Sequence, residues 1–171
     1  MLELTPPTKI PWQVQILTLD YLVEGHLDSD RDGYPFRLFN HDITPIPLSQ
    51  ARFRPTGDLK LPERPVTPWV LINGDDLVAI IPRDDASVAH AIQVNASDRI
   101  ASRADVFAGP YVIRGTVHSP HEDLRIFAMR VGFIVRDAEI TCLRPDAQLV
   151  GLKAPIVLVL SRHKQLVAPI D

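Results

Sequence analysis

The chain has 171 residues, of which 46% are hydrophobic and 23% are charged, so it can bury a core and is not a disordered tail. Its net charge of −3 gives the whole molecule no electrostatic attraction to nucleic acid or anionic lipid. The single cysteine, Cys142, excludes an intramolecular disulfide and a multi-cysteine zinc site, and its apolar neighbours predict a buried thiol.

Sixteen prolines are scattered along the chain. Because proline interrupts helix interiors and central strands, they favour short strands and turns over long helices. Residues 1–12 carry three of these prolines and are predicted to form an extended arm. This arm has no signal-peptide pattern, and no apolar run in the chain approaches the length of about 20 residues that spans a membrane. We therefore expect a soluble, cytoplasmic protein.

A strand is predicted from Gln13 onward, because apolar side chains alternate with a period of two from Leu17 to Leu27. The same pattern recurs over residues 107–117, and Gly25 and Gly115 occupy corresponding inward positions. A glycine inside a strand indicates a bend or a close backbone approach. A long strand that bends at its glycine can pair with two neighbours and close a small barrel.

Several segments match in the same order, which predicts an internal duplication. The matching segments are 21–29 with 111–119 (displacement 111 − 21 = 90), 46–53 with 133–140 (87), 68–71 with 155–158 (87) and 77–79 with 166–168 (89). The last displacement implies that the loop before residue 166 is two residues longer than its counterpart.

The second matching segment changes its alternation halfway along in both copies. Ile46 and Leu48 alternate in one register, and Ala51 continues one residue out of step. A register change turns side chains to the other face unless an extra residue absorbs it. We therefore predict β-bulges at Ser49-Gln50 and at Arg136-Asp137.

Two further elements are predicted around the third segment. Asn73-Gly74 lies between apolar runs, which is typical of a type I′ hairpin. The matching segment of the second copy contains the continuous apolar run 156–160. This run predicts a strand that is covered on both faces where the copies meet. A single short helix is predicted over residues 84–93, capped by Asp84 or Asp85.

The loop that begins at Asp28 resembles the start of a calcium loop. Asp28, Asp30 and Asp32 occupy positions 1, 3 and 5, and glycine follows at position 6. Position 12, where a glutamate belongs, is Phe39. The alternatives are a calcium site and a solvated acidic loop.

The corresponding loop of the second copy contains His118, His121 and Glu122. Imidazole and carboxylate groups suit zinc or nickel, and a polar loop is the alternative. The chain has neither a nucleophile elbow nor a glycine-rich phosphate loop, so we expect no catalytic residues and no cofactor other than the calcium alternative.

Basic residues gather in the second copy. Residues 1–90 hold 8 Lys+Arg against 13 Asp+Glu (8 − 13 = −5), and residues 91–171 hold 10 against 8 (10 − 8 = +2). Convergence of Arg114, Arg125, Arg136 and Arg144 on one face would attract phosphates. The alternative is that these arginines are solvated charges on outward strand faces.

Short glycine-bent strands, a bulged strand and a closing hairpin within about 70 residues resemble the Sm-like and SH3-like small barrels. The chain is also similar to an uncharacterised bacterial module with a Tyr-x-x-x-Gly strand, through the segments 37–40 and 124–127. This resemblance implies a fold and no known activity. We predict an all-β fold of two tandem small barrels, residues 13–83 and 104–171, joined by a linker of residues 84–103, with one merged pseudo-symmetric sandwich as the alternative. The copies are expected to be related by a pseudo-twofold axis or to pair side by side.

These expectations favour a non-catalytic binding or scaffold module that acts through a protein partner or by self-association, on the analogy of other small barrels. One alternative is an Sm-like nucleic-acid-binding module that uses the arginines of the second copy. Another is a metal-binding protein or enzyme that uses loop 28–33 or 118–123.

Overall fold

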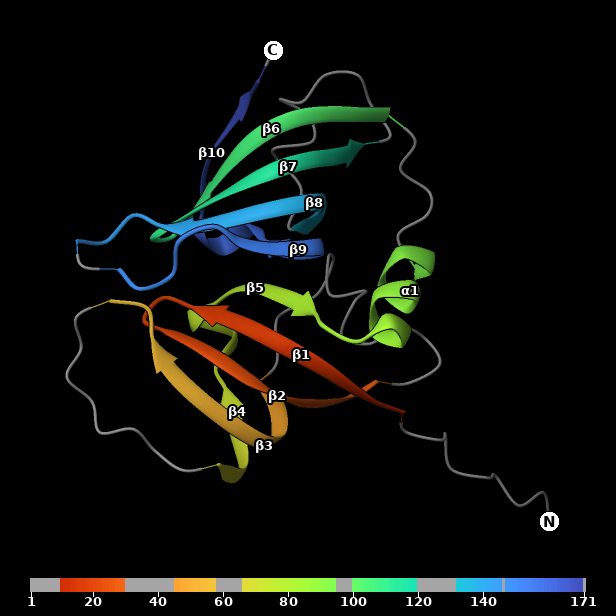
Figure 1. Cartoon of the computed structure of the whole chain (residues 1–171), viewed down its shortest axis with the longest axis vertical. Coiled ribbons are helices and arrows are strands. Elements are labelled where there is room, and N and C mark those ends of the chain that lie inside the picture. The colour runs from red at the N-terminus through yellow and green to blue at the C-terminus, as the bar shows by residue number, and fades with distance from the viewer. Residues whose placement is uncertain are drawn as a thin grey trace.

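The structure is a computed structural model, and it describes residues 10–29, 45–57, 66–94, 100–119, 132–145 and 147–170. Ten antiparallel strands form one continuous sheet, so the prediction of an all-β fold is confirmed (Figure 1). The strands are β1 (Ile10–Thr18), β2 (Tyr21–Ser29), β3 (Ile46–Pro55), β4 (Thr67–Ile72), β5 (Leu77–Pro82), β6 (Ile100–Ala108), β7 (Tyr111–Ser119), β8 (Gly132–Cys142), β9 (Leu152–Leu160) and β10 (Lys164–Pro169). Their order in the sheet is β10-β6-β7-β8-β9-β5-β1-β2-β3-β4.

The strand order is the same in the two halves of the sheet. We call β1 to β5 the N-terminal half and β6 to β10 the C-terminal half. In each half the fifth strand pairs with the first, and the second, third and fourth strands follow in sequence. The registers also agree: Ile10 faces Ser29 across β1 and β2, and Ile100 faces Ser119 across β6 and β7, each displaced by 90.

Backbone hydrogen bonds outside the strands agree in the same way. The N–H of Leu19 donates to the carbonyl of Asp76 at 3.1 Å, and the N–H of Gly109 donates to the carbonyl of His163 at 2.7 Å. Two further pairs of N–H to carbonyl bonds correspond. The bond from Arg83 to Gln13 corresponds to the bond from Ile170 to Arg103. The bond from Thr56 to Asp20 corresponds to the bond from Leu143 to Pro110. The correspondence therefore extends from the strands into the turns.

The predicted displacement of 89 for the last strand is wrong. Leu17 of β1 faces Ala79 of β5, and its counterpart Phe107 of β6 faces Leu166 of β10. Ala79 therefore corresponds to Leu166, a displacement of 87 (166 − 79). No residue is inserted before the last strand, because the displacement is 87 on both sides of the loop. Each loop contains a three-residue 3-10 helix, η1 (Gly74–Asp76) and η2 (Ser161–His163).

The predicted pseudo-twofold relation between the halves is also wrong. The halves meet where β5 pairs with β9, with Ala79 facing Val159 and Ile80 facing Leu158. A twofold axis would then also pair the equivalent strands β10 and β4. Instead these two strands form opposite ends of the sheet, and the halves join head to tail.

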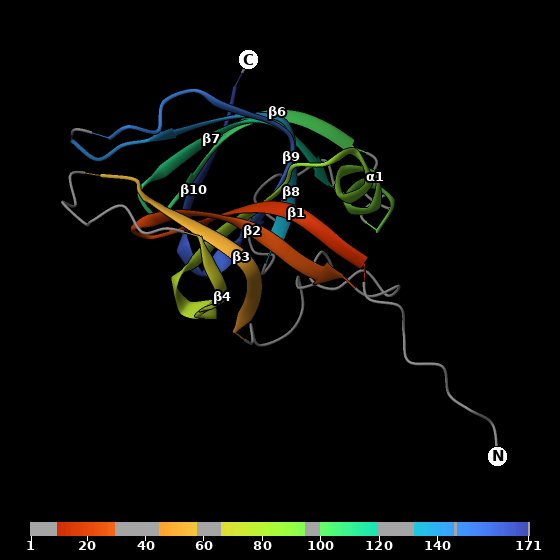
Figure 2. The same cartoon turned by 60° about the horizontal axis from the view of Figure 1, so that its bottom comes forward.

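Each half closes the core of the other. The turned view in Figure 2 shows both halves as strongly curved parts of the one sheet. Ile156 and Leu158 of β9 pack into the core of the N-terminal half, while Leu17 and Ala79 of that half pack into the core of the C-terminal half. Every residue of β5 and every residue from 156 to 160 in β9 is buried. The prediction of a strand covered on both faces is confirmed, and Cys142 is buried as predicted.

Both predicted β-bulges are present. The pairing shifts by one residue between β2 and β3 and again between β7 and β8, and Gln50 and Asp137 take positive φ angles of 51° and 49°. The two glycines lie opposite these bulges. A Cβ on Gly115 would approach the carbonyl oxygen of Arg136 to 2.6 Å, and one on Gly25 would approach that of Ser49 to 3.0 Å. Glycine is required because the bulged strand passes so close.

The alternating stretch 17–27 is two strands, where a single strand was predicted. β1 ends at Thr18 and β2 begins at Tyr21, because the Thr18 hydroxyl accepts the Tyr21 N–H at 3.0 Å and closes a tight turn. β1 also begins at Ile10, within the predicted arm, and β6 begins at Ile100, within the predicted linker.

The predicted Asn73-Gly74 hairpin is wrong. A type I′ turn needs positive φ at both residues, but Asn73 has φ −65° and its side chain accepts the N–H of Asp75, which begins η1. β5 then pairs with β1 and β9, and β4 pairs with β3. Burial of β5 on both faces overrides the local preference of the Asn-Gly pair.

The predicted helix is present as α1 (Asp85–Val94), which packs against β1, β5 and β9. Asp84 caps it: one carboxylate oxygen accepts the N–H of Ser87 at 2.8 Å, and the other accepts the N–H of Gln13 at 2.7 Å. Desolvation raises the pKa of this carboxyl, but the hydrogen bonds outweigh it and hold the pKa below its usual value. Neither α1 nor any other helix in the described part of the chain has the length and apolar character needed to cross a membrane.

Candidate functional site

The loops that suggested metal sites lie mostly outside the described residues. Asp28 is exposed near the end of β2, and His118 is half-buried in β7. Asp30, Asp32, His121, Glu122 and the remainder of both loops are not described. Within the described ranges, no three His, Cys, Asp or Glu side chains are grouped so that they would hold a metal ion.

Two of the arginines in the predicted basic face are held by carboxylates. Arg114 forms two hydrogen bonds of 2.8 Å with Asp105, and this pairing holds the pKa of the Asp105 carboxyl below its usual value. Arg144 donates to Asp20 at 2.7 Å. Arg125 lies outside the described residues, and Arg136 is half-buried on β8.

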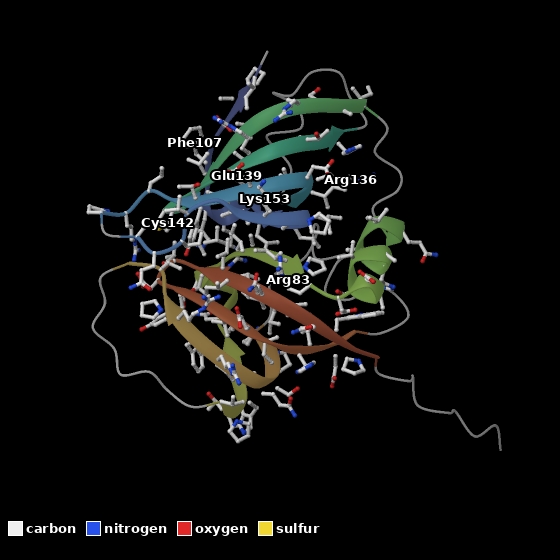
Figure 3. The ribbon with its side chains drawn as sticks, in the orientation of Figure 1. Arg83, Phe107, Arg136, Glu139, Cys142 and Lys153 are labelled. Carbon is white, nitrogen blue, oxygen red and sulfur yellow. The ribbon has the colours of Figure 1, made fainter. Side chains whose placement is uncertain are left out.

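The Arg114 pair belongs to a row of alternating charges across the outer face of the C-terminal half. Asp105 faces Arg114, Arg114 faces Glu139, and Glu139 faces Lys153. Figure 3 shows Glu139 and Lys153 close together on neighbouring strands. Opposite charges directly across a sheet attract, so this row accounts for Arg114 as part of the sheet surface.

A buried hydroxyl connects the halves. Tyr111, fully buried at the start of β7, donates its hydroxyl hydrogen to the carbonyl of Thr18 at 2.7 Å, and the Thr56 hydroxyl lies 3.1 Å away. Burial raises the pKa of this phenol to about 12, because the charged form would lie in an apolar surrounding. The Arg144–Asp20 pair lies at the same junction, so polar and apolar contacts together fix the head-to-tail arrangement.

Three of the five large apolar side chains that are exposed in the described residues lie on β4 or directly before it. Trp69 is 67% exposed and Leu71 is 56% exposed, both on β4, and Val66 directly before this strand is 44% exposed. Among the strands of the structure, β4 pairs with β3 alone, so its other side is a sheet edge. An open strand edge is a template for pairing with another chain, and contiguous exposed apolar groups are typical of interaction sites.

The corresponding strand of the C-terminal half gives a direct comparison. With the displacement of 87, Trp69 corresponds to Ile156 and Leu71 corresponds to Leu158. These two β9 residues are 0% and 2% exposed, because they pack into the neighbouring half. The same strand position is therefore a buried contact in β9 and an open apolar surface in β4.

The opposite end of the sheet is also apolar. β10 pairs with β6 and forms the other edge, and its Val167 and Ala168 are half-buried. Beside it lies Phe107 of β6, which is labelled in Figure 3. Phe107 faces Val112 of β7, and both side chains are half-buried. We call the β4 surface of Val66, Trp69 and Leu71 the donor edge. We call the surface of Phe107, Val112, Val167 and Ala168 the acceptor edge.

The donor edge had a signal in the sequence that the hairpin interpretation concealed. Residues 69–72 are Trp-Val-Leu-Ile, which is apolar on both faces of a strand. A strand with one face in water alternates apolar and polar residues, so a fully apolar run indicates a second covering surface. That surface is present for β9 and absent for β4 within the described residues.

No protein-family model matches the chain, and no curated protein and no solved structure matches it either.

Proposed function

We propose that the chain is a non-catalytic scaffold module, made of two copies of one small bent-strand β-unit, that joins protein chains through its donor edge. The observation that supports this function most strongly is the exposure of Trp69 and Leu71 on an unpaired edge strand. The corresponding registers and turn hydrogen bonds of the halves support the two-copy origin.

Strand addition is the binding mode that fits this surface. An edge strand offers a row of free N–H and C=O groups, and an extended segment that pairs with it gains main-chain hydrogen bonds. Side chains beside the edge then select the partner. Covering a leucine-sized apolar side chain contributes about 1.5–3 kcal/mol, so Trp69 and Leu71 would dominate the binding energy.

The nucleic-acid alternative has less support. Arg114 and Arg144 are engaged by carboxylates, and Arg114 continues into the row of alternating charges. A row of alternating sign does not present the positive field that attracts a phosphate backbone. The proposed scaffold needs no cofactor and no catalytic group.

Affinity capture with two double variants tests the scaffold function. Trp69→Glu/Leu71→Glu places carboxylates on the donor edge, and both positions are exposed enough to keep the fold. Gln148→Glu/Val150→Glu is the matched control, because both side chains are exposed in the segment between β8 and β9, outside the donor edge. We expect the donor-edge variant, and not the control, to lose the proteins that wild type retains.

Amide hydrogen exchange then locates the contact. In a captured complex, we expect the amides of β4 (Thr67–Ile72) to exchange more slowly than in the free protein, because a paired edge strand protects its N–H groups. Retention of all partners by the donor-edge variant, together with unchanged exchange in β4, would refute the proposed function.

A further inference from the structure

We propose that the strand that pairs with the donor edge is β10 of a second copy of the same chain. This inference rests on the proposed function and names its partner. Copies would associate head to tail, with β4 of one copy beside β10 of the next, and the sheet would continue from chain to chain.

The junction between the halves supplies the geometry of this contact. Within the chain, β9 pairs with β5, with Val159 facing Ala79 and Leu158 facing Ile80. In the proposed contact, β4 of one copy takes the place of β9, and its residues lie 87 positions earlier in the chain. β10 of the next copy takes the place of β5, and its residues lie 87 positions later. The intermolecular register is then Ile72 facing Leu166 and Leu71 facing Val167.

The donor edge has large apolar side chains at two of the four positions with which the C-terminal half enters the core of the N-terminal half. In β9, Ile156 and Leu158 seal the core of the neighbouring half and are almost fully buried. In β4, the corresponding Trp69 and Leu71 are at least as large and stand in solvent. A second copy beside β4 would cover them as the N-terminal half covers β9.

The acceptor edge keeps apolar residues at most of the positions that the internal junction uses, and the exceptions are Gln165 and Gly109, the counterparts of Val78 and Leu19. Leu17 and Leu22 on the outer face of the N-terminal half are 0% and 3% exposed, because the C-terminal half covers them. Their counterparts, Phe107 and Val112, are apolar too and only half-buried. Ile81 of β5 is buried, and its counterpart Ala168 of β10 is half-buried.

Prolines on the two edge strands do not oppose this pairing. Pro68 on β4 and Pro169 on β10 would each interrupt a ladder hydrogen bond at an edge. Their counterparts, Pro155 and Pro82, occupy the same positions of β9 and β5, which pair with each other inside the chain. The internal junction accommodates prolines at these positions.

Because the two surfaces differ, the contact is heterologous. A heterologous contact generates a closed ring when its rotation closes and an open filament when it does not. The internal junction is already a contact of this type, so each chain contributes two units to such an assembly. A symmetric dimer formed by two donor edges is not the predicted product.

Sedimentation velocity of the purified protein over a wide concentration series tests the association. We expect wild type and the Gln148→Glu/Val150→Glu control to form a ring or a growing series of oligomers, because both control positions are exposed outside the two edges. The Trp69→Glu/Leu71→Glu variant should remain monomeric, with association weakened at least about a hundredfold, since buried aromatic and apolar anchors dominate interfaces. Monomeric wild type at all concentrations, or equal association of the donor-edge variant, would overturn the proposal.

A mixed cysteine cross-link tests the register. Leu71→Cys in one preparation and Val167→Cys in another should form an intermolecular disulfide when mixed, because facing strand residues lie within disulfide reach. Val66→Cys with Val167→Cys is the control: five residues along a strand correspond to about 16 Å, too far to bridge. Cys142 is buried and stays in place. Equal cross-linking of both mixtures would reject the register.

The outcomes separate this inference from the proposed function. If the purified chain is monomeric but its donor edge is protected in a complex with another protein, the scaffold function stands and the self-association is wrong. If wild type associates and the cross-link follows the predicted register, both stand. If neither association nor capture depends on the donor edge, both fail.

Discussion

β4 and β9 occupy the same position in the two halves, yet one is exposed and the other is central to the molecule. β4 pairs with β3 in the same register as β9 pairs with β8. Trp69-Val70-Leu71 therefore corresponds to Ile156-Val157-Leu158. Only β9 has a neighbour on its second side, where it pairs with β5. The difference shows that a fully apolar strand predicts a covering surface, and that topology decides whether that surface belongs to the same chain.

Truncation of the corresponding leucines of β9 and β4 tests this comparison, and it gives the largest expected change in stability. Leu158→Ala should destabilise the protein by about 2–5 kcal/mol, because it leaves a cavity in a packed core. Leu71→Ala should change stability by no more than about 0.5 kcal/mol in the dilute protein, because that side chain is 56% exposed. Urea unfolding at low concentration measures both, and equal costs would contradict the comparison.

The glycines opposite the bulges give a graded test between the halves. Gly115→Ala should cost about 1–3 kcal/mol, because the added Cβ would meet backbone at 2.6 Å and the bulged strand would have to move. Gly25→Ala should cost less, since its nearest backbone contact is 3.0 Å. Thermal unfolding of both variants gives the order, and a reversed order would show that the bulge of the N-terminal half is the more rigid one.

The tyrosine at the start of the second strand differs in role between the halves. Tyr111→Phe should cost about 1–2 kcal/mol at neutral pH, because it leaves the buried Thr18 carbonyl and Thr56 hydroxyl without their partner. The counterpart variant Tyr21→Phe provides the control, since Tyr21 is only half-buried. Chemical denaturation of the two variants measures the difference.

Because of Tyr111, we expect the stability of the protein to depend on pH in the alkaline range. The phenol has a pKa of about 12 in the folded protein, above its ordinary 10.0. A phenol whose pKa is raised on folding stabilises the folded protein fully below its pKa in the unfolded chain. This contribution to stability is lost as pH rises from 10 toward 12. The stability gap between wild type and Tyr111→Phe should therefore narrow above pH 10, and a constant gap would contradict the assignment.

The helix α1 follows the last strand of the N-terminal half, and loss of its cap should destabilise the protein less than the core and glycine substitutions. Asp84→Ala should cost about 1 kcal/mol through loss of the capping bonds to Ser87 and Gln13. The pKa of Asp84 lies below its ordinary 3.8, so its stabilisation is present above that pH and is lost as pH falls through the folded value. Acid titration of stability should show wild type and variant converging below pH 3.8.

Features set by local pattern could be predicted from the sequence. The bulges followed from a register change that both copies share, and the two-sided burial of β9 followed from five consecutive apolar residues. The helix followed from Asp84 and the alanines after it.

Features set by distant contacts could not be predicted. Asn73-Gly74 favours a hairpin locally, but every residue of β5 is buried and the strand pairs with β1 and β9. The head-to-tail junction and the Tyr111 hydrogen bond join residues from different halves, and no spacing along the chain encodes them. The donor edge was hidden for the same reason, because exposure of Trp69 depends on what lies beside β4.

The junction between β5 and β9 also sets a delay during synthesis on the ribosome. Ala79 pairs with Val159, a separation of 80 residues (159 − 79 = 80). At about 5–20 residues per second, a nascent chain waits roughly 4–16 s between completing β5 and producing its partner strand. During that interval the core of the N-terminal half lacks Ile156 and Leu158, its apolar cover. During the same interval β5 is open to β9 of another chain, and such an exchange of strands is a characteristic route to misassembly.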